Sequence, residues 1–152
     1  SSDWDFVAGG YDVPTSGNVT ESSLGIDPEF LLTVVTQLQS SDAHVDNSTQ
    51  GSAIGVSMCA SGSEYGCTIS HQHNVTTSVA KSLTKASTVC LEDGGTLDIE
   101  GTHTLGTDEF TLTLTNHPAT ATKAFYLAAG PATSGGGSAA LFSNHVRRQM
   151  VG

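Results

Sequence analysis

Positive charge is scarce in this 152-residue chain, which has 5 Lys and Arg against 15 Asp and Glu and a formal net charge of −10. An acidic surface repels the phosphate backbone, so this balance argues against a DNA- or RNA-binding role for the body of the domain. Long hydrophobic runs are missing as well, since no apolar stretch approaches the roughly 20 residues that a membrane-spanning helix needs. We therefore expect a soluble, acidic protein without membrane or nucleic-acid partners.

Cysteine is limited to Cys59, Cys67 and Cys90. An odd number argues against the complete disulfide framework of a secreted protein. One bond, between Cys59 and Cys67 across a hairpin, stays open as an alternative. The preferred interpretation is three small buried thiols.

Motifs for catalysis are missing too, because the chain contains no Gly-x-Ser-x-Gly elbow, P-loop or His-Glu-x-x-His pattern. His71 and His73 lie two apart on a predicted strand and would share one face, but the spacing supplies no third metal ligand. Cys67 and His71 would lie roughly 13 Å apart on that strand, too far for a nucleophile and its base. We expect no enzymatic activity, no cofactor and no bound metal.

Alternating apolar and polar residues are what the chain does have. Phe110, Leu112 and Leu114 alternate with threonines, which is the cleanest period-two pattern. The most apolar run, residues 30–38, is rich in β-branched residues and predicts a central strand. Further strands are predicted at 1–10 (or an anchoring arm there), 53–59, 67–71, 87–91, 97–100 and 125–127, the last as a core strand. We interpret residues 11–25 and 39–52 as loops and the start of 75–91 as irregular.

Turn signals separate these strands every 8 to 12 residues, a spacing typical of two-layer antiparallel folds. We predict an all-β chain, an antiparallel β-sandwich or jelly roll of about eight to nine strands with extended N- and C-terminal arms. The predicted divisions are an N-terminal arm and loop (1–23), the sandwich (24–130), and a Gly-rich hinge with a docking tail (131–152).

Both ends of the chain carry candidate contact residues. Gly135, Gly136 and Gly137 form a flexible hinge, followed by apolar residues and both arginines of the protein. A short segment of this kind cannot fold alone, so we expect it to dock, with its cations on an acidic partner such as another copy of the domain. The predicted partner-binding residues are Trp4, Phe6, Leu141, Phe142, Arg147 and Arg148.

Four segments, in order, resemble a family of small virion structural proteins of tailed bacteriophages and prophages. Residues 25–32 are similar to its Gly-Phe-x-Pro approach to the first core strand, with Ile26 in place of Phe. Residues 53–56 resemble its small and apolar strand after a long loop. Residues 106–114 resemble its Asp-Gly-Phe-Thr-Leu-Asn-Trp hairpin, and residues 125–130 its closing Tyr-Leu-Ala-Leu-Gly strand.

The resemblance spans residues 24 to 130 and implies a virion structural component without known enzymatic activity. We expect a capsid decoration or cement protein on the outer shell of a tailed virus, bound to the major capsid protein or other virion proteins. Repeated weak contacts in a symmetric homo-oligomer, such as a trimer, would add up through avidity. The alternatives are a tail or neck component of the virion, associated with the tail tip or a fibre, and a secreted β-sandwich that binds carbohydrates or surfaces.

Overall fold

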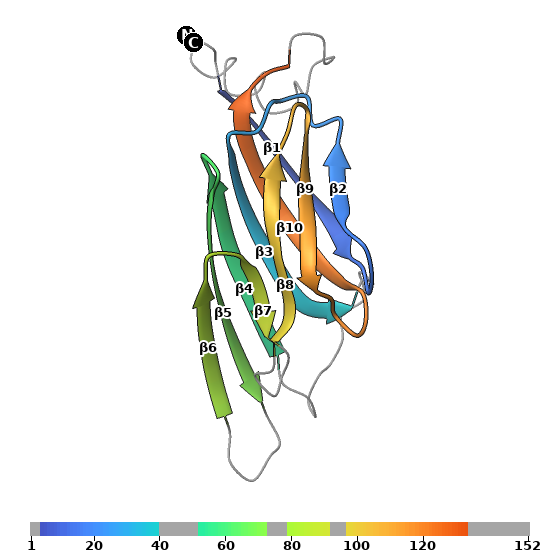
Figure 1. Cartoon of the computed structure of the whole chain (residues 1–152), viewed down its shortest axis with the longest axis vertical. Helices are drawn as coiled ribbons and strands as arrows, with labels where there is room; N and C mark the ends of the chain where they lie inside the picture. The colour runs from blue at the N-terminus through green and yellow to red at the C-terminus, as the bar shows by residue number, and fades with distance from the viewer. Residues whose placement is uncertain (1–3, 40–51, 73–78, 92–96, 134–152) are drawn as a thin grey trace, which may run out of the picture.

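The computed structural model describes residues 4–39, 52–72, 79–91 and 97–133, and this part of the chain forms ten strands in two antiparallel sheets (Figure 1). The larger sheet has the order β1 (Trp4–Val13), β10 (Thr122–Pro131), β3 (Phe30–Gln39), β4 (Ser52–Ala60), β5 (Ser63–Gln72), β6 (Val79–Lys85). The smaller sheet has the order β2 (Val19–Ser22), β9 (Glu109–Asn116), β8 (Leu97–Leu105), β7 (Thr88–Leu91). The predicted antiparallel β-sandwich is confirmed.

Two short strands were not predicted. Strand β2 lies in the segment 11–25, which was interpreted as a loop, and β6 lies in the stretch interpreted as irregular. Val19 is the only buried apolar residue of β2, so this strand carries almost no period-two signal. The N-terminal segment is a strand, because β1 pairs with β10 along its whole length, from Trp4 opposite Pro131 to Val13 opposite Thr122.

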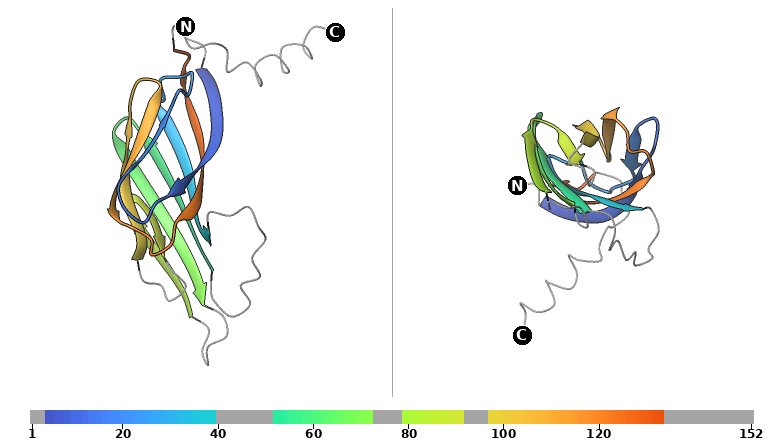
Figure 2. Two further views of the ribbon diagram at one scale, coloured as in Figure 1. Left: turned by 90° about the vertical axis from the view of Figure 1, so that its right-hand side faces the viewer. Right: turned by 90° about the horizontal axis from the view of Figure 1, so that it is seen from below.

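The larger sheet curls around the smaller one, as the view from below shows (Figure 2). Its inner side faces the smaller sheet, and its outer side is convex and free of any other described element. No helix that could cross a membrane is found among the described residues.

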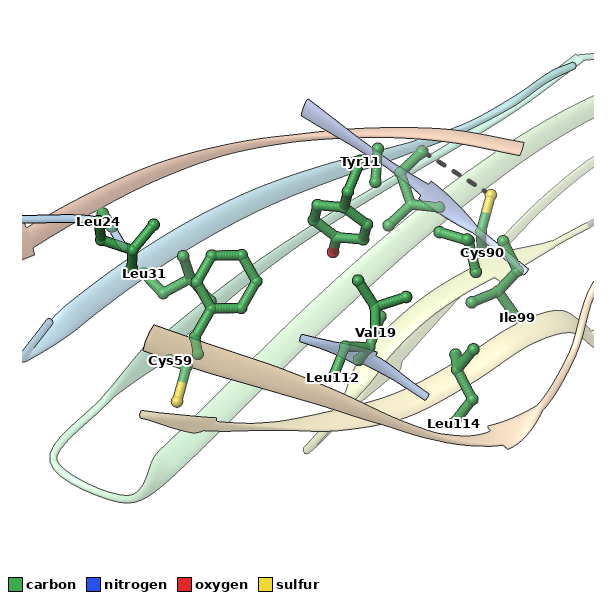
Figure 3. Packing of buried hydrophobic residues seen from close by; sticks show 14 of the residues in the cluster. Tyr11, Val19, Leu24, Leu31, Cys59, Cys90, Ile99, Leu112 and Leu114 are labelled. Atoms are coloured by element: carbon green, nitrogen blue, oxygen red, sulfur yellow. Dashed lines mark hydrogen bonds between the residues drawn. The ribbon is translucent and has the colours of Figure 1, made fainter. Parts of the chain in front are cut away.

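The core lies between the two sheets and is built from the inward residues of both (Figure 3). The ring of Phe110 on β9 is fully buried and lies edge-on to Tyr11 of β1 and to Tyr126 of β10, with centroid distances of 5.9 Å and 5.0 Å. Leu112 and Ile99 of the smaller sheet pack in the same cluster. These aromatic contacts pack β9 of the smaller sheet against β1 and β10 of the larger sheet.

Strand β7 lies unusually close to β4 and β5, and two glycines make the approach possible. A Cβ atom at Gly55 would lie 1.9 Å from the carbonyl oxygen of Val89, and one at Gly66 would lie 2.1 Å from that of Ser87. Any side chain at either position would collide with backbone. The space between the sheets is therefore narrow at Gly55 and Gly66, where no side chain fits.

Candidate interaction surface

The alternation of side chains in β4 and β5 is the reverse of that in an ordinary half-buried sheet. Their inward residues are small or polar, and their outward residues are large and apolar. The inward set is Ala53, Gly55, Ser57, Cys59, Glu64, Gly66, Thr68 and Ser70, and the outward set includes Ile54, Val56, Met58, Tyr65 and Ile69. The close approach of β7 requires the small inward residues, but it does not account for the large apolar residues on the solvent side.

The outward sides of β1, β10, β3, β4, β5 and β6 form one continuous surface, which we call the outer face. All large hydrophobic side chains that are exposed in the described part of the chain lie on it: Trp4, Phe6, Ile54, Val56, Met58, Tyr65, Ile69, Phe125 and Leu127. The most exposed are Phe6 and Tyr65, at 63% and 68%. Apolar side chains scattered singly over a surface need no explanation, but a contiguous patch of this extent marks an interaction site.

The strand register aligns these side chains in rows across the sheet. One row runs from Ala8 through Leu127, Leu32 and Met58 to Tyr65. The next runs Gly10, Phe125, Val34, Val56, Cys67, and on the other side lies the row Phe6, Ala129, Phe30, Ala60, Ser63. Directly opposed residues of an antiparallel pair lie on the same face with Cβ atoms about 5 Å apart, so the side chains of one row are neighbours across the sheet.

Charge is almost absent from the outer face. Among the residues that point outward from its described strands only Asp12 and Lys123 are charged, and they pair with each other at 2.9 Å near one end of the sheet. Lys85 of β6 lines a hollow in this face and is paired with Glu100 at 2.6 Å. The chain as a whole has a net charge of −10. A large uncharged surface on a strongly acidic protein removes the repulsion that would otherwise keep a protein partner away.

The smaller sheet is different on its solvent side. Thr102 and Thr104 of β8 and Thr113 and Thr115 of β9 are exposed there, and the inward partners of this alternation are buried, as predicted for residues 110–115. A threonine surface is well hydrated, so this side needs no partner. The apolar character of the outer face is therefore a property of one sheet and not of the whole surface.

A hollow of about 580 Å³ interrupts the outer face over β3 to β6. Its walls include Leu32, Met58, Tyr65 and Cys67, with Thr84 at the β6 side. A depression lined by apolar side chains can receive an aromatic or aliphatic side chain of a partner, which is the usual form of an interface hot spot.

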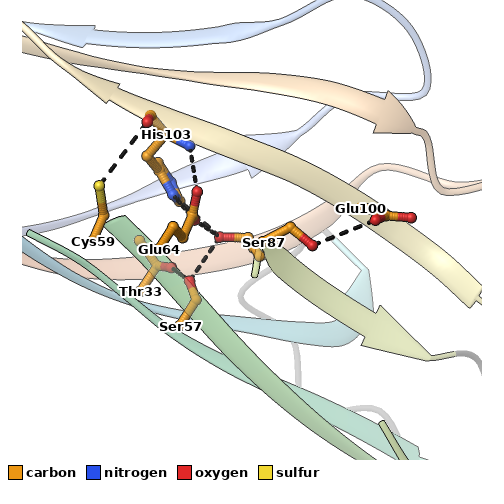
Figure 4. A network of polar contacts seen from close by, with 8 residues as sticks. Thr33, Ser57, Cys59, Glu64, Ser87, Glu100 and His103 are labelled. Atoms are coloured by element: carbon orange, nitrogen blue, oxygen red, sulfur yellow. Dashed lines mark hydrogen bonds and ion pairs between the residues drawn. The ribbon is translucent and has the colours of Figure 1, made fainter. Parts of the chain in front are cut away.

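A second feature, between the sheets, is a chain of buried polar side chains (Figure 4). The carboxylate of Glu64 on β5 accepts hydrogen bonds from His103 Nδ1 at 2.7 Å, from the His103 backbone amide at 2.8 Å and from the Thr88 hydroxyl at 2.6 Å. Because the single proton of Thr88 goes to Glu64, Ser57 donates to Thr88 at 2.7 Å. Thr33 in turn donates to Ser57 at 2.5 Å. This network joins β3, β4, β5, β7 and β8.

The hydrogen bonds decide the ionisation of Glu64. Burial alone would raise its pKa, but the bonds from the His103 ring, the Thr88 hydroxyl and the His103 amide hold the pKa of Glu64 below its ordinary value. The residue is therefore an ionised, fully hydrogen-bonded carboxylate inside the sandwich. The sequence offered little sign of it, since Glu64 lies in no catalytic motif and its partner His103 is 39 residues away along the chain. The one available signal was that His103 alternates with the inward residues Ile99 and Gly101.

The Glu64–His103 pair resembles the carboxylate and the base of a catalytic triad, but among the described residues no nucleophilic side chain is hydrogen-bonded to Nε2 of His103. His103 Nε2 is buried and has no hydrogen-bond partner among the described residues. The Cys59 thiol points to the backbone oxygen of His103, at 4.0 Å, and not to the ring. Burial raises the pKa of Cys59 and raises that of Cys90 to about 12, so both thiols are protonated at neutral pH. The described contacts of this network join the two sheets.

The cysteines correct one prediction. The prediction of three buried thiols is confirmed for Cys59 and Cys90, but it is wrong for Cys67, which is exposed on the outer face. Cys59 points inward and Cys67 outward, and their register partners are Glu64 and Val56, so a bond between them across the hairpin is excluded. No group of three or more metal-ligating side chains occurs in the described segments. The side chains of His71 and His73 are outside the described set.

The predicted contact residues fall into two groups. Trp4 and Phe6 both lie on the outer face, at the β1 edge, and both are exposed. Leu141, Phe142, Arg147 and Arg148 lie outside the described residues. The sequence prediction missed the larger part of the outer face, because Phe125 and Leu127 were assigned to a core strand. In β10 the inward positions are instead Ala124, Tyr126 and Ala128.

Comparisons with protein-family models, with curated proteins and with solved structures found no match to this chain.

Proposed function

We propose that this protein is a virion structural component, a capsid decoration protein that binds the outer shell of a tailed virus. One observation carries the proposal: the outer face is a contiguous, apolar surface with few charges, on a sandwich that has its own core on the other side of the same sheet. Such a surface is built to be covered by another protein. The ordered resemblance of residues 24–130 to small virion proteins supports the choice of a virion as the setting.

The surface favours a protein partner over a sugar. A carbohydrate site combines stacking rings with polar groups that bind the sugar hydroxyls. The central rows of the outer face place Leu127, Leu32 and Met58 between the aromatic rings instead. Contact with an apolar protein surface satisfies these side chains, whereas a sugar would leave most of them without a partner.

The test is the composition and reassembly of the particle. We expect the protein in purified virions in a number comparable to the shell subunits, and we expect the purified chain to rebind particles from which it has been stripped. A copy number far below that of the shell, with labelling at the tail or neck, would replace the decoration role by the tail role. Absence of the protein from particles would overturn the proposal.

A further inference from the structure

We infer that the outer face pairs with the outer face of a second copy of this chain, in a two-fold dimer whose axis runs along β3. The inference rests on the proposed function in one respect, namely that the outer face is a protein contact. It assigns that contact to a second copy of the chain, so binding to the shell is left to other parts of the dimer, among them the predicted docking tail at 131–152. Three observations carry it: the extent of the face, its lack of charge, and the sizes of the side chains on either side of β3.

The extent of the face is sufficient for a specific interface. The five adjacent strands β1, β10, β3, β4 and β5, at about 4.8 Å spacing, and three rows about 7 Å apart define a surface of about 500 Å² per copy, or about 1,000 Å² for two copies. Specific protein interfaces begin at about that total. The sheet curls, so two outer faces diverge toward their flanks (Figure 2). The two most exposed side chains, Phe6 and Tyr65, stand on the flanking strands β1 and β5, where they can span the widening gap.

The lack of charge allows two acidic bodies to meet. Each chain carries a formal net charge of −10, which opposes association through any charged part of the surface. On the described part of the outer face Asp12 and Lys123 neutralise each other, and Lys85 beside the hollow is paired with Glu100. Like-charge contacts are therefore avoided where two outer faces meet.

Side-chain size is complementary between the flanking strands β1 and β5. A two-fold axis along β3 places β10 of one copy over β4 of the other, and β1 over β5, because of the strand order. Within the same rows, Phe6 then lies over Ser63, and Ala8 lies over Tyr65. Large residues thus meet small ones on both flanks, and two sheets packed with aligned strands can interdigitate.

The hollow on the outer face has an occupant in this arrangement. Phe125 of one copy lies over Val56 of the other, in the row that leads to Cys67, and Leu127 lies over Met58. Val56, Met58 and Cys67 are walls of the 580 Å³ hollow. An aromatic ring from β10 seated beside these residues is a central, desolvated anchor of the kind that dominates interface energies.

The oligomeric state of the purified full chain tests the inference directly. We expect sedimentation equilibrium to give twice the chain mass of 15.6 kDa. Met58→Glu places a charge at the centre of the contact in both copies, so we expect it to weaken the dimer by at least about 100-fold. Thr113→Glu is the matched control, since it adds the same charge at an exposed strand position of the other sheet, and it should leave the dimer unchanged.

Cross-linking tests the geometry. Ala8 of one copy lies over Tyr65 of the other, one row from the exposed thiol of Cys67, whereas within one chain β1 and β5 are separated by three strands. We expect a short bis-maleimide to link the new thiol of the Ala8→Cys variant in one copy to Cys67 of the other copy, which gives a covalent dimer. The Thr113→Cys variant should give none. The circular dichroism of each variant verifies that it is folded.

Every other outcome counts against the pairing. A monomer or a trimer at all concentrations overturns it. Deletion of residues 138–152 is a second check. If Cys67 becomes reactive in the shortened chain at every protein concentration, the tail covers the outer face instead of a second copy, and the pairing is overturned. A monomer that still binds particles overturns the pairing and leaves the decoration role standing. A dimer that is absent from particles overturns the decoration role and leaves the pairing standing.

Discussion

Glu64 of β5 and His103 of β8 form a hydrogen-bonded pair of 2.7 Å between the two sheets, with only 6% and 1% of their side chains exposed. The carboxylate fills its remaining positions with the His103 amide and the Thr88 hydroxyl. A buried carboxylate with all these partners is tolerated, but one that loses a partner leaves an unpaired group behind. We therefore expect the free energy of unfolding to depend on every hydrogen bond that this pair makes.

Glu64→Gln tests this sensitivity at nearly constant volume. The new amide group offers hydrogens where His103 and Thr88 also donate, so at least one donor loses its acceptor. We expect the free energy of unfolding to fall by about 1–3 kcal/mol, measured by urea denaturation. Glu109→Gln, at an exposed position of β9, is the matched control and should stay within about 0.5 kcal/mol of the wild type. Equal stability of the two variants would show that the network is not stabilising.

The same pair predicts a pH dependence. Because the folded-state pKa of Glu64 lies below its ordinary value of 4.5, its contribution to stability is complete above that value and is lost as the pH falls through the folded-state pKa. We expect the difference in melting temperature between the wild type and Glu64→Gln to be constant near neutral pH and to shrink below about pH 4.5. A difference that grows in acid would contradict the assignment.

Gly55→Ala tests the close approach of β7. The added Cβ would lie 1.9 Å from the Val89 carbonyl oxygen, so β4 and β7 must separate. We expect a loss of about 3 kcal/mol or more in the free energy of unfolding, or no folded protein. Gly10→Ala on β1 is the comparison, because its Cβ would meet its nearest atom at 3.2 Å, and we expect a change below about 1 kcal/mol. Similar losses at both positions would mean that β7 does not press on β4.

Thiol titration tests the placement of the cysteines. In dilute, native protein we expect a maleimide or disulfide reagent to modify Cys67 rapidly and to leave Cys59 and Cys90 unmodified, since burial both shields these two and raises the pKa of each. Urea should expose all three thiols. Cys67→Ser should remove the rapid phase, and a rapid phase that persists in this variant would place another thiol at the surface.

Deletion of residues 138–152 tests the predicted docking tail, which lies outside the described residues. The sandwich has its core within residues 11–128, so we expect the shortened chain to keep its circular dichroism spectrum. We expect it to lose binding to particles in co-sedimentation, because the apolar and basic segment is absent. Arg147→Ala with Arg148→Ala separates the two parts of the tail, and a reduced salt dependence of binding is expected for this variant. Unimpaired binding of the shortened chain would remove the tail from the contact.

Much of the fold could be read from local patterns. The threonine alternation at 110–115 predicted both the strand and its buried side correctly, because β9 lies over a wide part of the core where Phe110 and Leu112 fit. The same kind of pattern at Ile54, Val56 and Met58 predicted a strand, and β4 is one. The pattern did not indicate that Ile54, Val56 and Met58 face outward.

The sequence by itself determined the all-β class, the two-residue rhythm and the acidic, cation-poor surface, because each follows from side chains and their nearest neighbours along the chain. Only the tertiary structure decided which side of each strand is inside. That choice depends on contacts between residues far apart in sequence: β7 presses against Gly55 and Gly66, which leaves room for small and polar groups such as Ser57 and Glu64 and turns the large side chains of β4 and β5 to the outer face. That packing decides that Ile54, Val56 and Met58 face outward, which no local pattern could reveal, but it does not require these residues to be apolar.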